Sequence, residues 1–161
     1  PYHTVVPGSG WHDMIETAKG QNIFADVTSS VIEAGEGGSV HSFEIDPEAV
    51  LLREPQIIVN RGHSNYKSSS EELREPLVEM TQRPGWDQLP AVQDQQVYSI
   101  TRFAGGSVSK LIGALYLAKW MHPEAMADVD PGEAFQQWIE EFQGQPMPEP
   151  SSHTASLNEG S

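Results

Sequence analysis

The fold is decided by the stretch Ile45-Asp-Pro-Glu-Ala-Val-Leu-Leu-Arg-Glu-Pro-Gln-Ile-Ile-Val-Asn60. Asp46 is suited to cap a helix whose first residue is the proline that follows it, because a missing N–H costs nothing at that position. Glu48 falls in the first turn, where the helix dipole favours a carboxylate. Pro55 stops the helix, and the apolar, β-branched run 56–60 predicts a buried strand. A short helix that leads directly into such a strand is half of a β-α-β unit.

Regular elements are expected on both sides of this stretch. Strands are predicted at 2–6 and 95–100, helices at 11–18, 71–82, 107–121 and 131–143, and a Gly- and Ser-rich loop at 28–42. Pro76 is expected to kink or restart its helix. Because strands alternate with helices, we expect an α/β fold, namely a three-layer α/β/α sandwich with a mostly parallel central sheet. The folded unit is expected to span 1–144, with the proline- and serine-rich segment 145–161 as a disordered tail or linker.

Composition narrows the classes of function. With 161 residues and 17.7 kDa, 37% hydrophobic residues and a mean hydropathy of −0.44, the chain has the character of one soluble domain without a membrane span. It contains no cysteine, which excludes disulfides, cysteine zinc sites and thiol catalysis. The net charge of −14 disfavours nucleic acid and anionic membranes as partners and favours a cationic docking surface. The same acidity also serves solubility or adaptation to salt.

Four segments resemble, in order and spacing, the C-terminal lobe of periplasmic substrate-binding proteins that serve ABC importers of iron-siderophores, haem and cobalamin. The Glu48 helix with its following strand is one of them. The others are Gly10-Trp11 through Ala18-Lys-Gly-Gln-Asn22, Trp86-Asp-Gln-Leu-Pro-Ala-Val-Gln-Asp-Gln-Gln-Val-Tyr98, and Leu115-Tyr-Leu-Ala-Lys-Trp-Met-His-Pro123. The resemblance covers about 8–144. Lys19 and Gln95 stand where the family has glycines and Gln56 where it has an aspartate, departures that concern turns and strand edges.

The resemblance implies a function as well as a fold. Such proteins have two α/β lobes joined by a rigid helix, with the ligand between them, so this chain is expected to be a C-terminal lobe without the N-terminal lobe of the same protein. The implied activity is extracytoplasmic capture of a metal chelate (ferric siderophore, haem or cobalamin type), without catalysis or an intrinsic cofactor. The expected location is the periplasm or the outer face of the cell membrane. The implied partners are the permease subunits of the importer, and Glu48 is the implied docking residue; otherwise Glu48 is an ordinary carboxylate at a helix start.

Candidate ligand residues follow from the rule that open α/β sheets bind ligands beyond the carboxyl ends of their strands. The candidates after the three strands are Ser9, Trp11, Arg61, Tyr66, Arg102 and Phe103, with His63 beside Tyr66. His41 and Phe43 lie where the family places another cleft loop. Aromatic faces combined with guanidinium groups suit a large, partly planar, anionic chelate. Each of these residues also has an ordinary interpretation: Trp11 as a core contact of its helix, for example, and Phe43 as a hydrophobic staple.

Other chemistries are weakly supported. No two of the six histidines have the i, i+4 spacing of a helical metal site, and there is neither a complete dinucleotide-binding loop nor a Gly-x-Ser-x-Gly elbow. Two alternatives stay open. One is a stand-alone α/β enzyme or cofactor-binding domain with a nitrogenase-like lobe, using His41, His63 and nearby carboxylates. The other is an interaction domain whose acidic surface meets a basic partner.

Overall fold

The computed structural model describes residues 2–33, 38–62, 68–106, 109–147 and 153–158. Its strands are β1 (Tyr2–Thr4), β2 (Gly38–Ser39), β3 (Ser42–Ile45), β4 (Ile58–Gly62), β5 (Val97–Thr101) and β6 (Thr154–Ser156). Its helices are α1 (Gly10–Thr17), α2 (Ser29–Glu33), α3 (Pro47–Arg53), α4 (Ser70–Thr81), α5 (Pro90–Gln93), α6 (Arg102–Gly105), α7 (Lys110–Met121) and α8 (Pro131–Gln137). A 3₁₀ turn, Trp86–Gln88, precedes α5, and a π-helical turn, Trp138–Phe142, extends α8. No helix in these ranges is long and apolar enough to cross a membrane.

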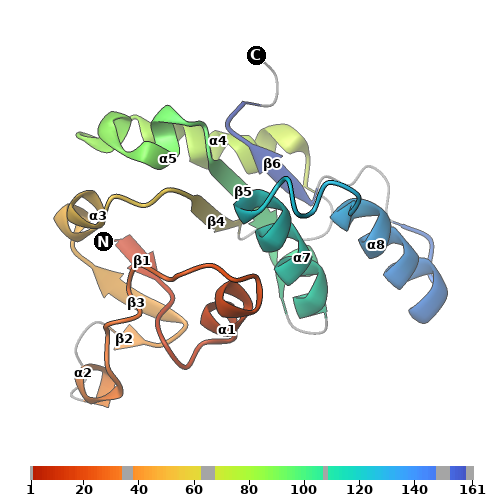
Figure 1. The fold of residues 1–161 in the computed structure, drawn as a ribbon, viewed down its shortest axis with the longest axis horizontal. Coiled ribbons are helices and arrows are strands. Elements are labelled where there is room, and N and C mark those ends of the chain that lie inside the picture. The colour runs from red at the N-terminus through yellow and green to blue at the C-terminus, as the bar shows by residue number, and fades with distance from the viewer. Residues whose placement is uncertain (1, 34–37, 63–67, 107–108, 148–152, 159–161) are drawn as a thin grey trace.

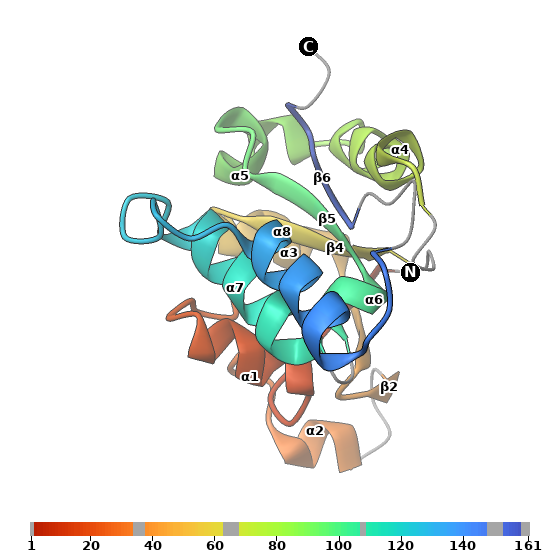
Figure 2. The same ribbon diagram turned by 90° about the vertical axis from the view of Figure 1, so that its right-hand side faces the viewer.

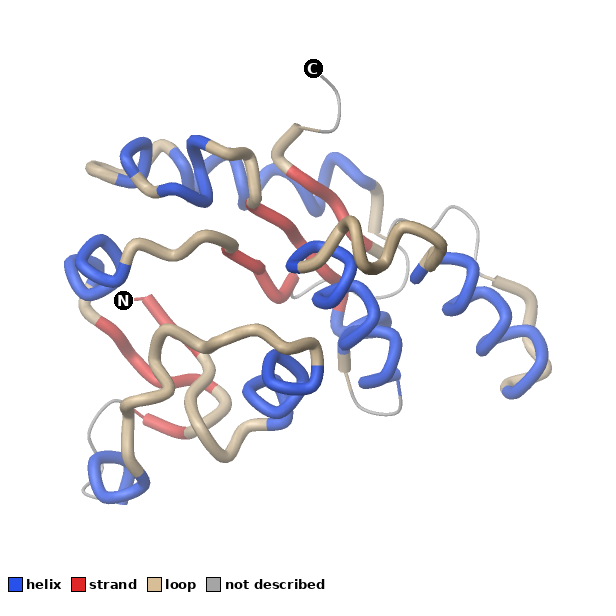
Figure 3. Tube along the Cα trace, viewed as in Figure 1, coloured by secondary structure: helices blue, strands red, loops and turns tan. Residues whose placement is uncertain are grey.

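The strands form two sheets of three strands each (Figures 1 and 3). In one, β4 and β5 are parallel, with Val59 opposite Tyr98, and β6 runs antiparallel along the other edge of β5. In the second sheet, β3 pairs antiparallel with both β1 and β2. The prediction of a mostly parallel central sheet is therefore wrong outside the β4–β5 pair. The reason is that the segment predicted as a loop contains β2 and leads into β3, which takes β1 as its antiparallel partner.

The α/β class is confirmed, and helices cover both faces of the β4–β5–β6 sheet. Figure 2 shows α4 and α5 on one side of this sheet and α7 on the other, with α1 beyond α7. Alternation of side chains along β5 explains the arrangement, because successive residues of a strand face opposite sides. Val97 packs with Leu77 of α4 on one face, whereas Ile100 packs with Ile112 of α7 and Phe135 of α8 on the other.

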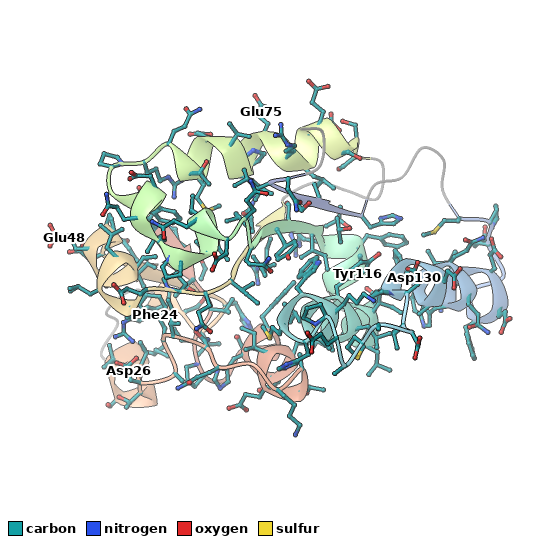
Figure 4. All side chains as sticks on the ribbon, turned by 45° about the horizontal axis from the view of Figure 1, so that its top comes forward. Phe24, Asp26, Glu48, Glu75, Tyr116 and Asp130 are labelled. Carbon is teal, nitrogen blue, oxygen red and sulfur yellow. The ribbon has the colours of Figure 1, made fainter. Side chains whose placement is uncertain are left out.

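The segment that opened the sequence analysis folds as predicted. Asp46 Oδ1 accepts a hydrogen bond from the Glu48 N–H at 2.9 Å and so caps α3, and β4 follows after Pro55. Arg53 in the last turn clamps α3 to the preceding chain through two hydrogen bonds to the Asp26 carboxylate, at 2.7 and 2.9 Å. These bonds lower the pKa of Asp26. Arg53 also lies over the ring of Phe24, 4.6 Å from its centroid. Figure 4 labels Asp26 and Phe24.

Pro76 does not restart its helix: α4 is a single helix from residue 70 to 81. A capping box between Ser69 and Glu72 begins it, each residue bonding the other's backbone N–H. Leu73 and Leu77, on either side of the proline, are fully buried. Burial of these two leucines is worth several kcal/mol, which offsets the roughly 3 kcal/mol that proline costs inside a helix.

The C-terminal segment differs from the prediction of a disordered tail, because Thr154–Ser156 forms β6. Backbone hydrogen bonds extend the pairing at both ends, from Thr101 N to His153 O at 2.9 Å and from Leu157 N to Val97 O at 3.0 Å. Ala155 is 2% exposed. One edge of β5 has backbone N–H and C=O groups that need partners, and the C-terminal segment supplies them. The composition of that segment does not reveal that β5 is its partner.

Two positions where the resembled family carries glycine have left-handed backbone here, with φ of 60° at Lys19 and 56° at Gln95. This conformation costs a residue with a side chain roughly 1–2 kcal/mol, more than glycine's entropic disadvantage of about 0.5–1 kcal/mol. We expect Lys19→Gly and Gln95→Gly each to raise the free energy of unfolding by about 0.5–1 kcal/mol in urea titrations. Glu79→Gly, at an exposed position inside α4, is the control and is expected to lower it by about 1 kcal/mol. A loss at all three positions would contradict the strain argument.

Candidate functional site

Trp11, in the first turn of α1, lies beside the carboxyl end of β4. Arg61 projects from the face of β4 that also carries Val59, and its guanidinium lies 5.6 Å from the Trp11 ring centroid. Burial, together with the nearby positive charge of Arg102 at the start of α6, lowers the pKa of Arg61. The structure thus brings together three of the predicted residues, one from each of three segments of the chain.

A third cation joins this group. Lys110, the first residue of α7, lies so close to α1 that a Cβ added at Gly10 would come within 2.6 Å of its Nζ. Gly105 of α6 has a similar role, since a Cβ there would come within 2.9 Å of the outer edge of the Trp11 ring. These two glycines allow α1, α6 and α7 to converge. We call Trp11, Arg61, Arg102 and Lys110 the cationic cluster.

Among the described residues, no ion pair neutralises a charge of the cationic cluster. The ion pairs recorded in the described ranges are His12–Glu16 at 3.4 Å and Arg53–Asp26 at 2.7 Å, and neither involves a member of the cluster. The charges of Arg61 and Arg102 are close enough to repel each other, which is unfavourable in the absence of an anion. In a protein with a net charge of −14, this arrangement is a local exception and favours an anionic ligand.

The other predicted ligand residues are placed differently. Ser9 is fully buried and caps α1 by accepting a hydrogen bond from the His12 N–H at 3.1 Å. Phe43 is buried in the core with Val6 and Val50. Phe103 turns inward and meets Phe135 edge-on, with ring centroids 5.3 Å apart. These three predictions are corrected, because the aromatic and hydroxyl groups serve packing and capping within the lobe.

His41 remains at the surface, in the turn between β2 and β3. The Val6 N–H donates to Val40 O at 3.1 Å, which keeps this turn next to the segment that leads into α1. Tyr66 and His63 lie outside the described residues. Within the described ranges, no group of three or more His, Asp or Glu side chains could hold a metal ion.

Sequence reasoning missed Lys110 and Gly105. Lys110 had a detectable signal, because a cation in the first turn of a helix opposes the helix dipole and calls for a compensating reason. Gly105 had none, since only the tertiary packing of Trp11 requires a residue without a side chain at that position.

Glu48, the predicted docking residue, is exposed in the first turn of α3, and Figure 4 shows it at the outer edge of the molecule, projecting away from the body. One turn later Leu52 is 84% exposed, so the two side chains lie on the same side of the helix. A shallow hollow beside the same helix is lined by Leu51, Glu54, Gly85, Asp87, Gln88 and Leu89. Another hollow, lined by Lys119 and residues 127–131, lies near the end of α7. Neither hollow is lined by a member of the cationic cluster.

Comparisons with known proteins agree with one another. A family model described as periplasmic binding protein matches residues 2–102. The TroA-like periplasmic binding protein FepB from Veillonella parvula has a similar fold, with a TM-score of 0.79 at 24% identity over 97% of this chain and 44% of that chain. The molybdate periplasmic binding protein MolA from Haemophilus influenzae, solved with molybdate bound, gives 0.66 at 18% identity over 91% and 40%.

A further solved structure, CeuE from Helicobacter pylori in a Ni-His complex, gives a TM-score of 0.59 at 20% identity over 87% of this chain and 40% of that chain. No curated protein matches the sequence. The chain spans less than half the length of each of these three solved proteins, and at these identities the likeness concerns the fold.

Proposed function

The chain belongs to the periplasmic binding protein family. We propose that it is the C-terminal lobe of an extracytoplasmic solute-binding protein that serves an ABC importer. Its length supports the proposal, since the match covers 97% of this chain but only 44% of the Veillonella protein. We infer that the remaining length there corresponds to a second lobe. The proposed activity is capture, not catalysis, in the periplasm or at the outer face of the cell membrane.

The cationic cluster carries the proposal for the ligand. Arg61, Arg102 and Lys110 offer charge-assisted hydrogen bonds to anionic oxygens, and the Trp11 ring offers a flat apolar face. An anionic, partly planar metal chelate fits both features, and a ferric siderophore is the class we favour, with haem or a cobalamin-type chelate as relatives of the same chemistry. In the proposed protein, the second lobe supplies the opposite wall of the site.

The α3 end of the lobe is the proposed contact with the permease. Glu48 is exposed and free of any recorded ion pair in the described ranges, and Leu52 adds an exposed apolar side chain one turn away. A carboxylate beside a leucine suits a membrane-protein surface that presents arginine next to apolar residues. Because α3 precedes β4 and lies toward its amino-terminal end, whereas the cluster lies at the carboxyl end, docking and capture would use different faces.

Titration with chelates tests the proposal. We expect the two-lobe protein to bind one of three probes (a ferric tris-catecholate, haem or cobalamin) with micromolar or tighter affinity, measured by tryptophan fluorescence quenching. The 161-residue chain alone is expected to bind the same probe at least ~100-fold more weakly, because half of the contacts are missing. Equal affinity of the two proteins would contradict the half-site, and turnover of a substrate by the isolated chain would contradict capture.

A further inference from the structure

Within the part of the chain that the structure describes, one buried histidine has a ring without a hydrogen-bond partner. His153, immediately before β6, is 6% exposed, and in the described structure neither ring nitrogen has a hydrogen-bond partner. The ring lies between Phe135 of α8, 4.8 Å away and nearly perpendicular, and Phe103 of α6, 5.7 Å away. An aromatic slot of this kind accepts a neutral imidazole far better than an imidazolium ion, which would lose its hydration without gaining an acceptor.

Among the described residues, no group around the ring offers an imidazolium ion a hydrogen-bond acceptor or a negative charge. Phe103 and Phe135 are apolar, and Thr101 of β5 contacts the backbone of His153 and not its ring. Tyr116 of α7 is engaged with the Thr154 side chain, and Arg102, the charged residue of α6, has the wrong sign. Burial is the cause that lowers the pKa of His153, with no contribution from a described charged neighbour.

A short path of hydrogen bonds joins His153 to the cationic cluster. The His153 carbonyl accepts from the Thr101 N–H at 2.9 Å. The Thr101 hydroxyl oxygen in turn accepts from the Ala104 N–H at 3.2 Å and so caps α6, the helix whose first residue is Arg102. Phe103, in the same four-residue helix, touches the His153 ring. The residue directly before β6 therefore contacts both the residue that caps α6, Thr101, and an aromatic side chain of α6, Phe103.

We propose that His153 is a proton-sensitive positioning residue: neutral, it holds β6 on β5 and α6 in place, and on protonation it leaves the aromatic slot and releases both. Released α6 no longer presents Arg102 beside Arg61, so the anion site loses a cation as the medium becomes acidic. The consequence for ligand rests on the proposed function, whereas the release of β6 does not.

The pH window follows from linkage. In the released strand the imidazole has its ordinary pKa near 6.5, and in the slot the pKa is lower. The released form then binds more protons at every pH between the two values, so the stability that His153 contributes is complete above about 6.5 and is lost as pH falls below it.

Amide hydrogen exchange followed by NMR on the 161-residue chain tests the proposal without any ligand. Between pH 7.5 and 5.0, after correction for intrinsic rates, protection of the Thr101, Ala104 and Leu157 amides is expected to fall at least ten-fold. The Ile58 amide, which bonds to Gln96 O, is the internal control and is expected to keep its protection. His153→Phe fills the slot without titrating, so it is expected to abolish the fall, while His3→Phe, at an exposed position in β1, retains it.

Unchanged protection in the wild type at pH 5.0, or the same loss in His153→Phe, would overturn the inference. A direct NMR titration guards against a variant that fails to fold: a His153 ring that titrates at or above the ordinary imidazole pKa of about 6.5 would overturn it as well. If none of the three chelate probes binds, the proposed function is contradicted and the exchange result is unaffected. Failure of the exchange experiment would leave the chelate site untouched.

Discussion

Replacing Arg61 and Arg102 together by alanine is expected to lower the affinity of the proposed two-lobe protein for the proposed anionic chelate by roughly 10²- to 10⁴-fold. A hydrogen bond that involves a charged group contributes about 1.5–3 kcal/mol, so two such groups account for about 3–6 kcal/mol, at 1.4 kcal/mol per factor of ten. Burial, and after it the nearby charge of Arg102, lowers the pKa of Arg61, so the two guanidinium groups are close enough to act on the same ligand.

Arg83→Ala is the matched control for this double variant. Arg83 also lies against aromatic rings, 4.2 Å from the Tyr2 centroid and 5.1 Å from that of Trp86, but it follows the far end of α4. We expect less than about a three-fold change in affinity for this variant, measured by calorimetry with the chelate probe that binds. Equal losses in the double variant and the control would show a general charge effect and contradict a site at the cationic cluster.

Phe135→Ala is expected to lower the free energy of unfolding by about 3–5 kcal/mol, the usual cost of truncating a fully buried phenylalanine. Phe135 is 0% exposed and contacts Phe103, Trp138 and His153, with centroids 5.3, 6.1 and 4.8 Å away. The change would leave a cavity where α6, α8 and β6 meet. Typical domains have only 5–15 kcal/mol of stability, so this loss is a large part of the total.

Urea unfolding at pH 7.5 measures this effect, and Phe142→Ala provides the control. Phe142 follows on the same helical segment but is 74% exposed, so its truncation is expected to change the free energy by no more than about 0.5 kcal/mol. A loss below about 1 kcal/mol for Phe135→Ala would contradict the view that α8 and β6 are integral parts of the lobe.

The candidate site was predicted in part. Trp11, Arg61 and Arg102 were expected near one another because each follows a predicted strand, and all three belong to the cluster. The argument holds for Arg61 and Arg102 because β4 and β5 are parallel neighbours, so that their carboxyl ends meet. Trp11 lies in the cluster for a different reason. Its preceding strand, β1, belongs to the other sheet, and α1 comes close because it packs on α7.

Phe103 and Ser9 show where such reasoning stops. Both follow strands, as a ligand residue would, yet each side chain faces inward, to Phe135 in one case and to the first turn of α1 in the other. Position along the chain indicates the end of the sheet at which a residue lies. The direction of its side chain depends on which neighbours offer apolar surface or an unpaired N–H.

The sequence by itself determined the local elements: the Asp46-capped helix and its following strand, the helices of the C-terminal half, and the α/β class. These depend on caps, prolines and periodicity within about ten residues, whose energies act wherever the chain goes. Only the tertiary structure decided that β6 pairs with β5, that β1 joins β3, and that Lys110 meets Gly10. Those contacts join segments far apart in the chain. They form because an open strand edge or a missing Cβ in one segment fits a second segment, and no single stretch of sequence contains both partners.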